Sequence, residues 1–214
     1  MDEEISIINS KARSEKIKNF FIKNKKILIF VLTILILIPI SFSTYQIYSA
    51  GHKKGLAEKY NLAVINFESG NKSKVLAEMK MIINEKDKTY SPLALYFLID
   101  NELITSTDET NEFFDILIKE TNLDNEIRNL IIYKKGLFNA NFETENNLIK
   151  ILNPVIKSES VWKSHALYLM AEYFFEKNQK QKAKEFYSQI LNYNKSNEKI
   201  LIETRKRLNR DFSD

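Results

Sequence analysis

The side chains that most often carry out chemistry in proteins are few and widely spaced in this sequence. It contains two histidines, His52 and His165, and no cysteine. A zinc site needs ligands at set spacings, and the sequence has no HExxH motif, no CxxC motif and no closely spaced pair of histidines. Without cysteine, a thiol nucleophile, a thiolate metal site and a disulfide are also excluded. We therefore expect no metal site.

Phosphate binding and acyl transfer lack their usual motifs as well. A phosphate loop needs clustered glycines, and a serine hydrolase of the α/β type needs a G-x-S-x-G turn, which the sequence does not contain. Carboxylate pairs such as Glu109 and Glu112 have the spacing of an ordinary solvated helix face. We expect neither a cofactor nor catalysis, because a new type of hydrolase would require a cluster of polar residues that we do not find. The four glycines are dispersed: Gly51, Gly55, Gly70 and Gly136.

Two stretches of the chain instead place aromatic side chains and scattered charge at helical spacing. Such faces suit extended or partly unfolded polypeptides, because aromatic anchors contribute much of the energy of protein recognition. The alternative is that each residue packs between neighbouring helices; we favour that alternative for any single residue and binding for the surface as a whole. The candidate binding residues are Tyr60, Val64, Phe67, His165, Tyr168, Glu172 and Phe175.

The composition predicts which elements must position these residues. Among 214 residues there are four glycines and three prolines, too few breakers for a fold of many strands. Hydrophobic residues make up 44% and charged residues 28%, the balance of a globular protein. The length allows one modest domain and an anchor. We predict an all-α protein whose helices are joined by short polar loops.

One apolar stretch near the N-terminus has the properties of a transmembrane helix. No charged residue occurs from Ile27 to Gly51, and about 20 apolar residues suffice to cross the hydrocarbon core of a bilayer. Tyr45 and Tyr48 lie where an interface would be. A cleaved signal peptide would have a shorter apolar core and a small-x-small cleavage site, and a buried core helix is rarely apolar all round. We predict a single membrane-spanning helix at residues 27–48.

The distribution of charge predicts the orientation of that helix. Residues 1–26 contain seven lysines and arginines against four acidic residues, and the remaining chain is nearly neutral. An excess of basic residues before the helix predicts a cytoplasmic N-terminus. The leader is then either a membrane-surface helix or, as we favour, a basic flank that sets the topology. A neutral domain does not favour nucleic-acid binding.

Beyond a linker at residues 49–56, apolar residues recur at i, i+3, i+4 and i+7 through residues 57–210, and residues 211–214 form a tail. Gly70 is suited to end a helix, Pro92 to begin one, Gly136 to close another, and Asn153 with Pro154 to disturb the end of a fourth. Each helix is too short to be stable alone, so packing must stabilise it. The predicted helices are 57–68, 75–83, 92–104, 109–119, 124–135, 143–152, 161–176, 181–191 and 197–209.

Residues 164–197 match the tetratricopeptide (TPR) pattern best. Ala171 and Ala183 are small where the two helices would cross closely, and Phe174 and Tyr187 would fill the space beside them. Lys195 and Asn178 depart from the proline and glycine of the pattern. We predict a TPR-like solenoid of three to four hairpins with a C-terminal capping helix. The matching positions are Leu167, Met170, Ala171, Phe174, Ala183, Tyr187 and Ile190.

The acidic tip at residues 2–4, the basic stretch into the anchor, and residues 161–167, 171–173 and 183–187 resemble the ancillary SecYEG translocon subunit family. The resemblance implies a bacterial inner-membrane protein with a periplasmic TPR domain. Its partners would be the SecYEG channel, periplasmic chaperones and unfolded exported polypeptides. The alternative function is a non-catalytic scaffold for cell division or outer-membrane assembly.

Overall fold

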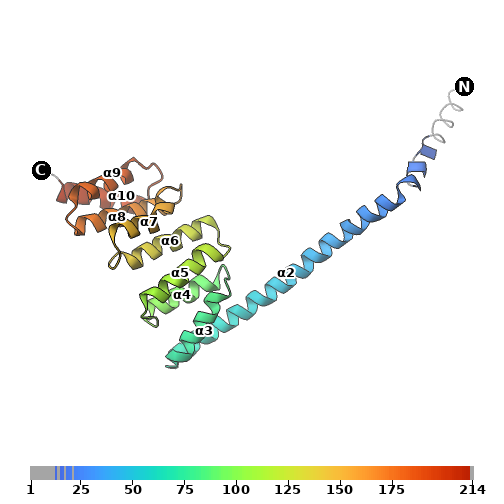
Figure 1. Cartoon of the computed structure of the whole chain (residues 1–214), viewed down its shortest axis with the longest axis horizontal. Coiled ribbons are helices and arrows are strands. Elements are labelled where there is room, and N and C mark those ends of the chain that lie inside the picture. Colours follow the sequence, from blue (N-terminus) through green and yellow to red (C-terminus); the bar gives the residue numbers. More distant parts are fainter. Residues whose placement is uncertain (1–12, 14, 17, 21, 213–214) are drawn as a thin grey trace, which may run out of the picture. The chain divides into compact units, whose positions relative to one another are not determined.

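The computed structural model describes residues 13, 15–16, 18–20 and 22–212 (Figure 1). The described residues form helices and no strand, which confirms the predicted all-α class. The chain divides into two units, Met1–Gly55 and Leu56–Asp214. Residues 1–12, which make up much of the predicted leader, lie outside the described residues.

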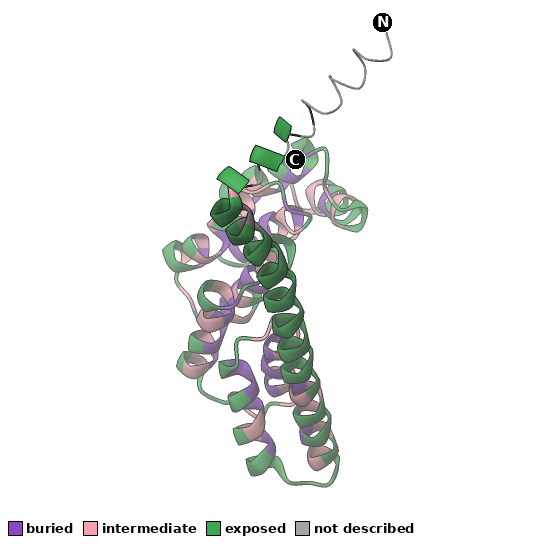
Figure 2. Cartoon of the chain, turned by 90° about the vertical axis from the view of Figure 1, so that its right-hand side faces the viewer, coloured by how far each residue is buried: buried purple, intermediate pink, exposed green. Residues whose placement is uncertain are grey.

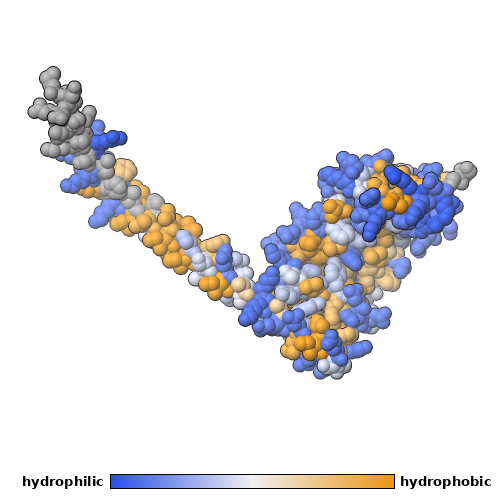
Figure 3. All heavy atoms as spheres, turned by 180° about the vertical axis from the view of Figure 1, so that it is seen from behind, coloured by the Kyte–Doolittle hydropathy of each residue, from blue (hydrophilic) through white to orange (hydrophobic). Residues whose placement is uncertain are grey.

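A single helix of 44 residues, α2 (Lys25–Glu68), contains the predicted anchor. It is long and apolar enough to cross a membrane, and Figure 3 shows hydrophobic side chains along it. The Thr33 and Thr44 hydroxyls donate hydrogen bonds of 2.8 and 3.1 Å to the carbonyls of Ile29 and Ile40, so these polar groups are satisfied within the helix. Residues 49–56, the predicted linker, are part of α2, and the boundary between the two units therefore falls within a continuous helix.

The second unit contains the end of α2 and a series of short helices. Figure 1 shows them following one another in chain order, from α3 at one end to α9 and α10 at the other. Their bounds agree with most of the predicted helices to within a few residues. They are α3 (Lys72–Asn84), α4 (Tyr90–Asp100), α5 (Thr107–Asp115), the π-helix η1 (Ile116–Glu120), α6 (Asn125–Asn139), α7 (Glu145–Ile156), α8 (Lys163–Glu176), α9 (Lys180–Asn192) and α10 (Glu198–Asp211).

Local sequence signals account for several helix ends. Gly70 has a φ of +85° directly after α2, the left-handed conformation that glycine adopts at low cost, which confirms its predicted role. Pro92 lies in the first turn of α4, as predicted. The Ser106 hydroxyl accepts a hydrogen bond of 3.2 Å from the backbone N–H of Glu109 and caps α5. The Asn197 side chain caps α10 in the same way.

Two predicted helix ends were wrong. Gly136 lies inside α6 instead of closing it, and Pro154 lies inside α7, which continues to Ile156. A Cβ atom at Gly136 would lie 2.8 Å from Cγ of Leu152, so any other residue here would require the Leu152 side chain to shift, because α6 and α7 approach closely. The sequence shows the glycine but not the helix that crosses it.

Buried side chains form two clusters within the second unit. The first joins the end of α2 with α3, α4, α5 and η1, and the second joins α7, α8 and α9. They meet at α6, where Ile131 belongs to the first cluster and Ile132 to the second. Figure 2 shows these buried stretches on the sides of the helices that face their neighbours. The seven residues that match the TPR pattern lie in α8 and α9, and we call them the α8–α9 packing pattern. All seven are buried, so their packing role is confirmed.

Candidate functional site

The three candidate residues of α2 lie against α4. The ring centroid of Tyr60 is 6.0 Å from that of Tyr90 and 6.3 Å from that of Phe97, and Phe67 is 5.3 Å from Phe97. Val64 packs against the same core cluster. These side chains are half-buried and join two neighbouring helices.

His165 lies in an aromatic cluster between α8 and α6. Its ring centroid is 5.1 Å from that of Trp162 and 5.7 Å from that of Tyr133, and Tyr133 stacks on Trp162 at 5.9 Å. Burial lowers the pKa of His165, because the protonated imidazole would lose hydration there. The neutral ring therefore packs as an aromatic side chain.

The remaining three candidates lie beside the C-terminal helix. Glu172 accepts a hydrogen bond of 2.5 Å from the Tyr187 hydroxyl and one of 2.9 Å from Nε of Arg207, and its other oxygen forms an ion pair with the same guanidinium. The ring of Phe175 lies 5.7 Å from that of Phe212 and 5.2 Å from the Arg207 guanidinium carbon. Tyr168 lies 5.9 Å from Tyr187, and burial raises the pKa of Tyr168. Residues of α10 and its end thus contact both Glu172 and Phe175.

The structure therefore distributes the seven candidate residues over three separate contacts between helices. Glu172 and Phe175 already have partners within the chain. A binding role for the seven residues stays a prediction, and we looked for open surface elsewhere in the second unit.

An apolar groove, here called the α4–α6 groove, lies between those two helices and encloses about 380 Å³. Each wall is one face of a helix, because its residues are spaced three or four apart. Leu93 and Ile127 are 43% and 42% exposed although both are large and apolar. The lining residues are Lys88, Thr89, Pro92, Leu93, Tyr96, Leu123, Asp124, Ile127, Leu130 and Ile131.

Tyr96, one of the lining residues of this groove, has a buried polar atom. Its hydroxyl is buried and has no hydrogen-bond partner within the described part of the chain. Burial raises the pKa of Tyr96, with a smaller contribution from the negative charge of Asp100. Nζ of Lys134 lies 5.8 Å from the centre of the Tyr96 ring. An unpaired buried hydroxyl costs about 1–3 kcal/mol, a cost that a ligand with a hydrogen-bonding group would remove.

Sequence reasoning missed this groove. Its signal is the spacing of Pro92, Leu93 and Tyr96 on one helix and of Ile127 and Leu130 on the next. The same spacing also fits an apolar helix face that is buried against a neighbouring helix, and the sequence pattern predicts such a buried face for both helices. Sequence alone does not distinguish an apolar face that a neighbour covers from one that stays open.

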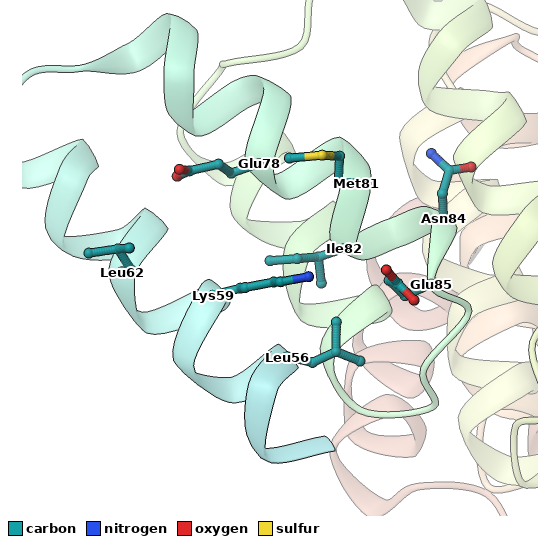
Figure 4. Close-up of a pocket in the computed structure, with 8 residues that line it drawn as sticks. All are labelled: Leu56, Lys59, Leu62, Glu78, Met81, Ile82, Asn84 and Glu85. Carbon is teal, nitrogen blue, oxygen red and sulfur yellow. The ribbon is translucent and has the colours of Figure 1, made fainter. Parts of the chain in front are cut away.

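A second groove, here called the α2–α3 groove, encloses about 560 Å³ between the end of α2 and α3 (Figure 4). In Figure 4, Lys59 extends from α2 toward Ile82 of α3. Leu62 and Met81 are 53% and 63% exposed. The lining residues are Leu56, Lys59, Leu62, Glu78, Met81, Ile82, Asn84 and Glu85.

Polar side chains elsewhere in the unit are mostly engaged with one another. Asn111 and Asn139 exchange two amide hydrogen bonds of 2.9 and 2.7 Å, and Nζ of Lys135 contacts Asp115 at 2.7 Å. Within residues 13, 15–16, 18–20 and 22–212, histidines and carboxylates form no group of three that could hold a metal ion.

Comparison with known proteins gave no match: no family model, no curated protein and no solved structure resembles the chain closely enough to be reported.

Proposed function

We propose that this chain is a membrane-tethered, non-catalytic protein-binding module that holds an apolar segment of an unfolded polypeptide in the α4–α6 groove. The observation that carries the proposal is a groove with mainly apolar walls in which Leu93 and Ile127 stay 43% and 42% exposed. Tyr96 of the same groove has a buried hydroxyl with no partner among the described residues. An open groove with one unsatisfied hydroxyl is typical of a site that its ligand completes.

The groove fits an extended peptide. Ligand pockets bind mainly through apolar walls and fix orientation with a few polar groups. Leu93 and Ile127 would contact apolar side chains of the ligand, while the Tyr96 hydroxyl would donate to a backbone carbonyl. Lys88 and Asp124 at the groove place one charge of each sign beside it. A ligand of either charge is therefore tolerated, which suits a binder of many sequences.

The candidate membrane span supplies the second element of the proposal. A domain tethered to a surface meets other proteins of that surface at a raised effective concentration, so a weak groove suffices. Insertion of α2 with its N-terminus in the cytoplasm would place the second unit outside the cytoplasm. This orientation rests on the basic residues that precede the apolar stretch.

The finer proposal is that the second unit is a TPR-like solenoid that assists protein export at the SecYEG channel, in the periplasm of a bacterial inner membrane. Its support is the α8–α9 packing pattern and the resemblance in sequence. The second candidate function, a scaffold for cell division or outer-membrane assembly, requires no client groove.

Purification of the full chain from detergent-solubilised membranes distinguishes these two candidate functions. Recovery of SecY supports export, whereas recovery of only division or outer-membrane assembly proteins contradicts it.

A binding assay tests the groove itself. The full chain in lipid nanodiscs would be titrated with a reduced and alkylated polypeptide that cannot fold, and binding would be followed by fluorescence anisotropy. Leu93→Lys with Ile127→Lys should weaken binding at least about tenfold, equivalent to about 1.4 kcal/mol. The matched control is Leu191→Lys, a similarly exposed leucine of α9 outside the groove. Equal affinities for the groove variant and the control would contradict the proposal.

A further inference from the structure

The two ends of the second unit differ in how their last helix pair is covered. At the C-terminal end, α10 packs against both α9 and α8. Leu201, Leu208 and Phe212 are half-buried against the second core cluster. The pair formed by α8 and α9 thus has α7 on one side and α10 on the other.

At the other end, the pair formed by the end of α2 and α3 is covered on one side only. Tyr60 and Phe67 of α2 face α4, and α3 packs on α4 as well. The opposite side holds the α2–α3 groove, which is lined by residues of these two helices and by Glu85, the residue that follows α3. Among the described residues of the second unit, a covering helix is therefore present at one end and not at the other.

The side chains of this uncovered face match what a helix would bury. Leu62 and Met81 are more than half exposed, while Leu56 and Ile82 form a buried floor with exposures of 1% each. Methionine adapts its shape to different partners and is common at binding surfaces. Two neighbouring helices with an apolar seam form the kind of groove into which an amphipathic helix lays its apolar face.

Charge at the groove defines the partner further. Glu78 lies on the α3 wall, Glu85 directly follows α3, and Lys59 lies on the α2 wall. Lys59 forms no ion pair within the described residues. Glu78 accepts a hydrogen bond of 3.3 Å from Asn66 and lies 3.7 Å from Nζ of Lys74. A helix in the groove would therefore be favoured by basic residues on the flank that faces α3. The chain pairs a basic residue of a covering helix with an acidic residue in this way at its other end, where Arg207 of α10 contacts Glu172 of α8.

From these observations we infer that the α2–α3 groove docks an amphipathic helix of another protein. Its apolar residues recur at i, i+3, i+4 and i+7, and basic residues flank them on the side of Glu78 and Glu85. The helix completes the N-terminal end of the unit as α10 completes its C-terminal end. This site is separate from the α4–α6 groove, and its occupant is helical rather than extended.

The test uses a synthetic helical peptide as long as α10, with leucines at those four spacings and lysines beside them. Two control peptides keep the same length: one scrambles the leucine stripe, and the other replaces the lysines with glutamates. Each is titrated, with a fluorescent label, into the full chain held in phosphatidylcholine nanodiscs. We expect the striped basic peptide to bind more tightly than either control.

Variants locate the binding site. Leu62→Lys with Met81→Lys should weaken binding of the striped peptide at least about tenfold, and Ile202→Lys, a similarly exposed residue of α10, should leave it unchanged. The thermal transition of each variant should match that of the parent, because the replaced side chains are exposed. The Leu93→Lys, Ile127→Lys variant should bind the striped peptide normally, so failure of one groove is distinguishable from failure of the other.

Several results would overturn the inference. These are equal binding of the scrambled peptide, absence of binding, or insensitivity of binding to the groove substitutions.

The chain has no cysteine, so Met81→Cys offers a unique site for an environment-sensitive label. A label response to protein concentration alone would show that a second copy fills the groove. A response to lipid composition alone would show that lipid does.

Discussion

The two halves of the second unit bury similar kinds of side chain, but they differ in how their surfaces are covered. In the half formed by α7, α8, α9 and α10, Glu172 pairs with Arg207 and with the Tyr187 hydroxyl. The half formed by the end of α2, α3, α4 and α5 borders both grooves, whose walls expose leucine, isoleucine or methionine. We call the first of these the closed half and the second the open half.

The largest expected effect tests the closed half. Glu172→Ala removes the acceptor of Arg207 and of the Tyr187 hydroxyl, and should lower the free energy of unfolding by about 2–3 kcal/mol, because hydrogen bonds to a charged group are strong and the donors are left unpaired. Hydrogen exchange should rise mainly in α10. Glu78→Ala in the open half, whose contacts are longer and more exposed, should cost less than about 1 kcal/mol. Equal losses for the two variants would remove the distinction between the halves.

A matched pair of tyrosines sharpens the comparison. Tyr187→Phe removes a hydroxyl that donates to Glu172, and should destabilise the unit by about 1–2 kcal/mol. Tyr96→Phe removes a buried hydroxyl that has no partner in the described chain, and should leave stability unchanged or raise it by about 1 kcal/mol. Denaturant unfolding of the two variants measures the difference. If Tyr96→Phe destabilised the unit as much as Tyr187→Phe, the Tyr96 hydroxyl would have an internal partner. It would then need no hydrogen bond from a ligand in the α4–α6 groove.

The smallest effect concerns pH. Burial lowers the pKa of His165 below its usual value of about 6.5, so the unfolded chain binds this proton more readily than the folded chain. Stability from this residue is fully present above that value and declines as pH falls toward the lowered pKa. His165→Phe retains an aromatic ring beside Trp162 and Tyr133 but cannot titrate. It should therefore show a smaller drop in thermal transition temperature between pH 8 and pH 5.

Regular spacing made much of the fold predictable. The apolar stretch before Gly51 predicted the candidate membrane span, because charge is absent from it. Gly70 marked a helix end, and Ala171 with Ala183 marked a close crossing in which both are fully buried. These signals are local: each depends on the residue type and the helix that carries it.

The predicted binding surface illustrates the limit. Tyr60 and Phe67 have the spacing of an exposed aromatic face, yet they pack on α4, and Phe175 packs beside Phe212. Gly136 resembles a helix end in sequence but lies where α6 meets Leu152 of α7. In each case the deciding neighbour is distant in sequence.

The sequence by itself determined that the chain is helical, that one helix is apolar enough to span a membrane, and which face of each short helix is apolar. Only the tertiary structure decided which of those faces are covered. An apolar face has the same residue pattern whether a helix packs on it or not. The α8–α9 pair is closed because α10 supplies Arg207 and Phe212, and the α2–α3 groove stays open because no helix of the second unit precedes it.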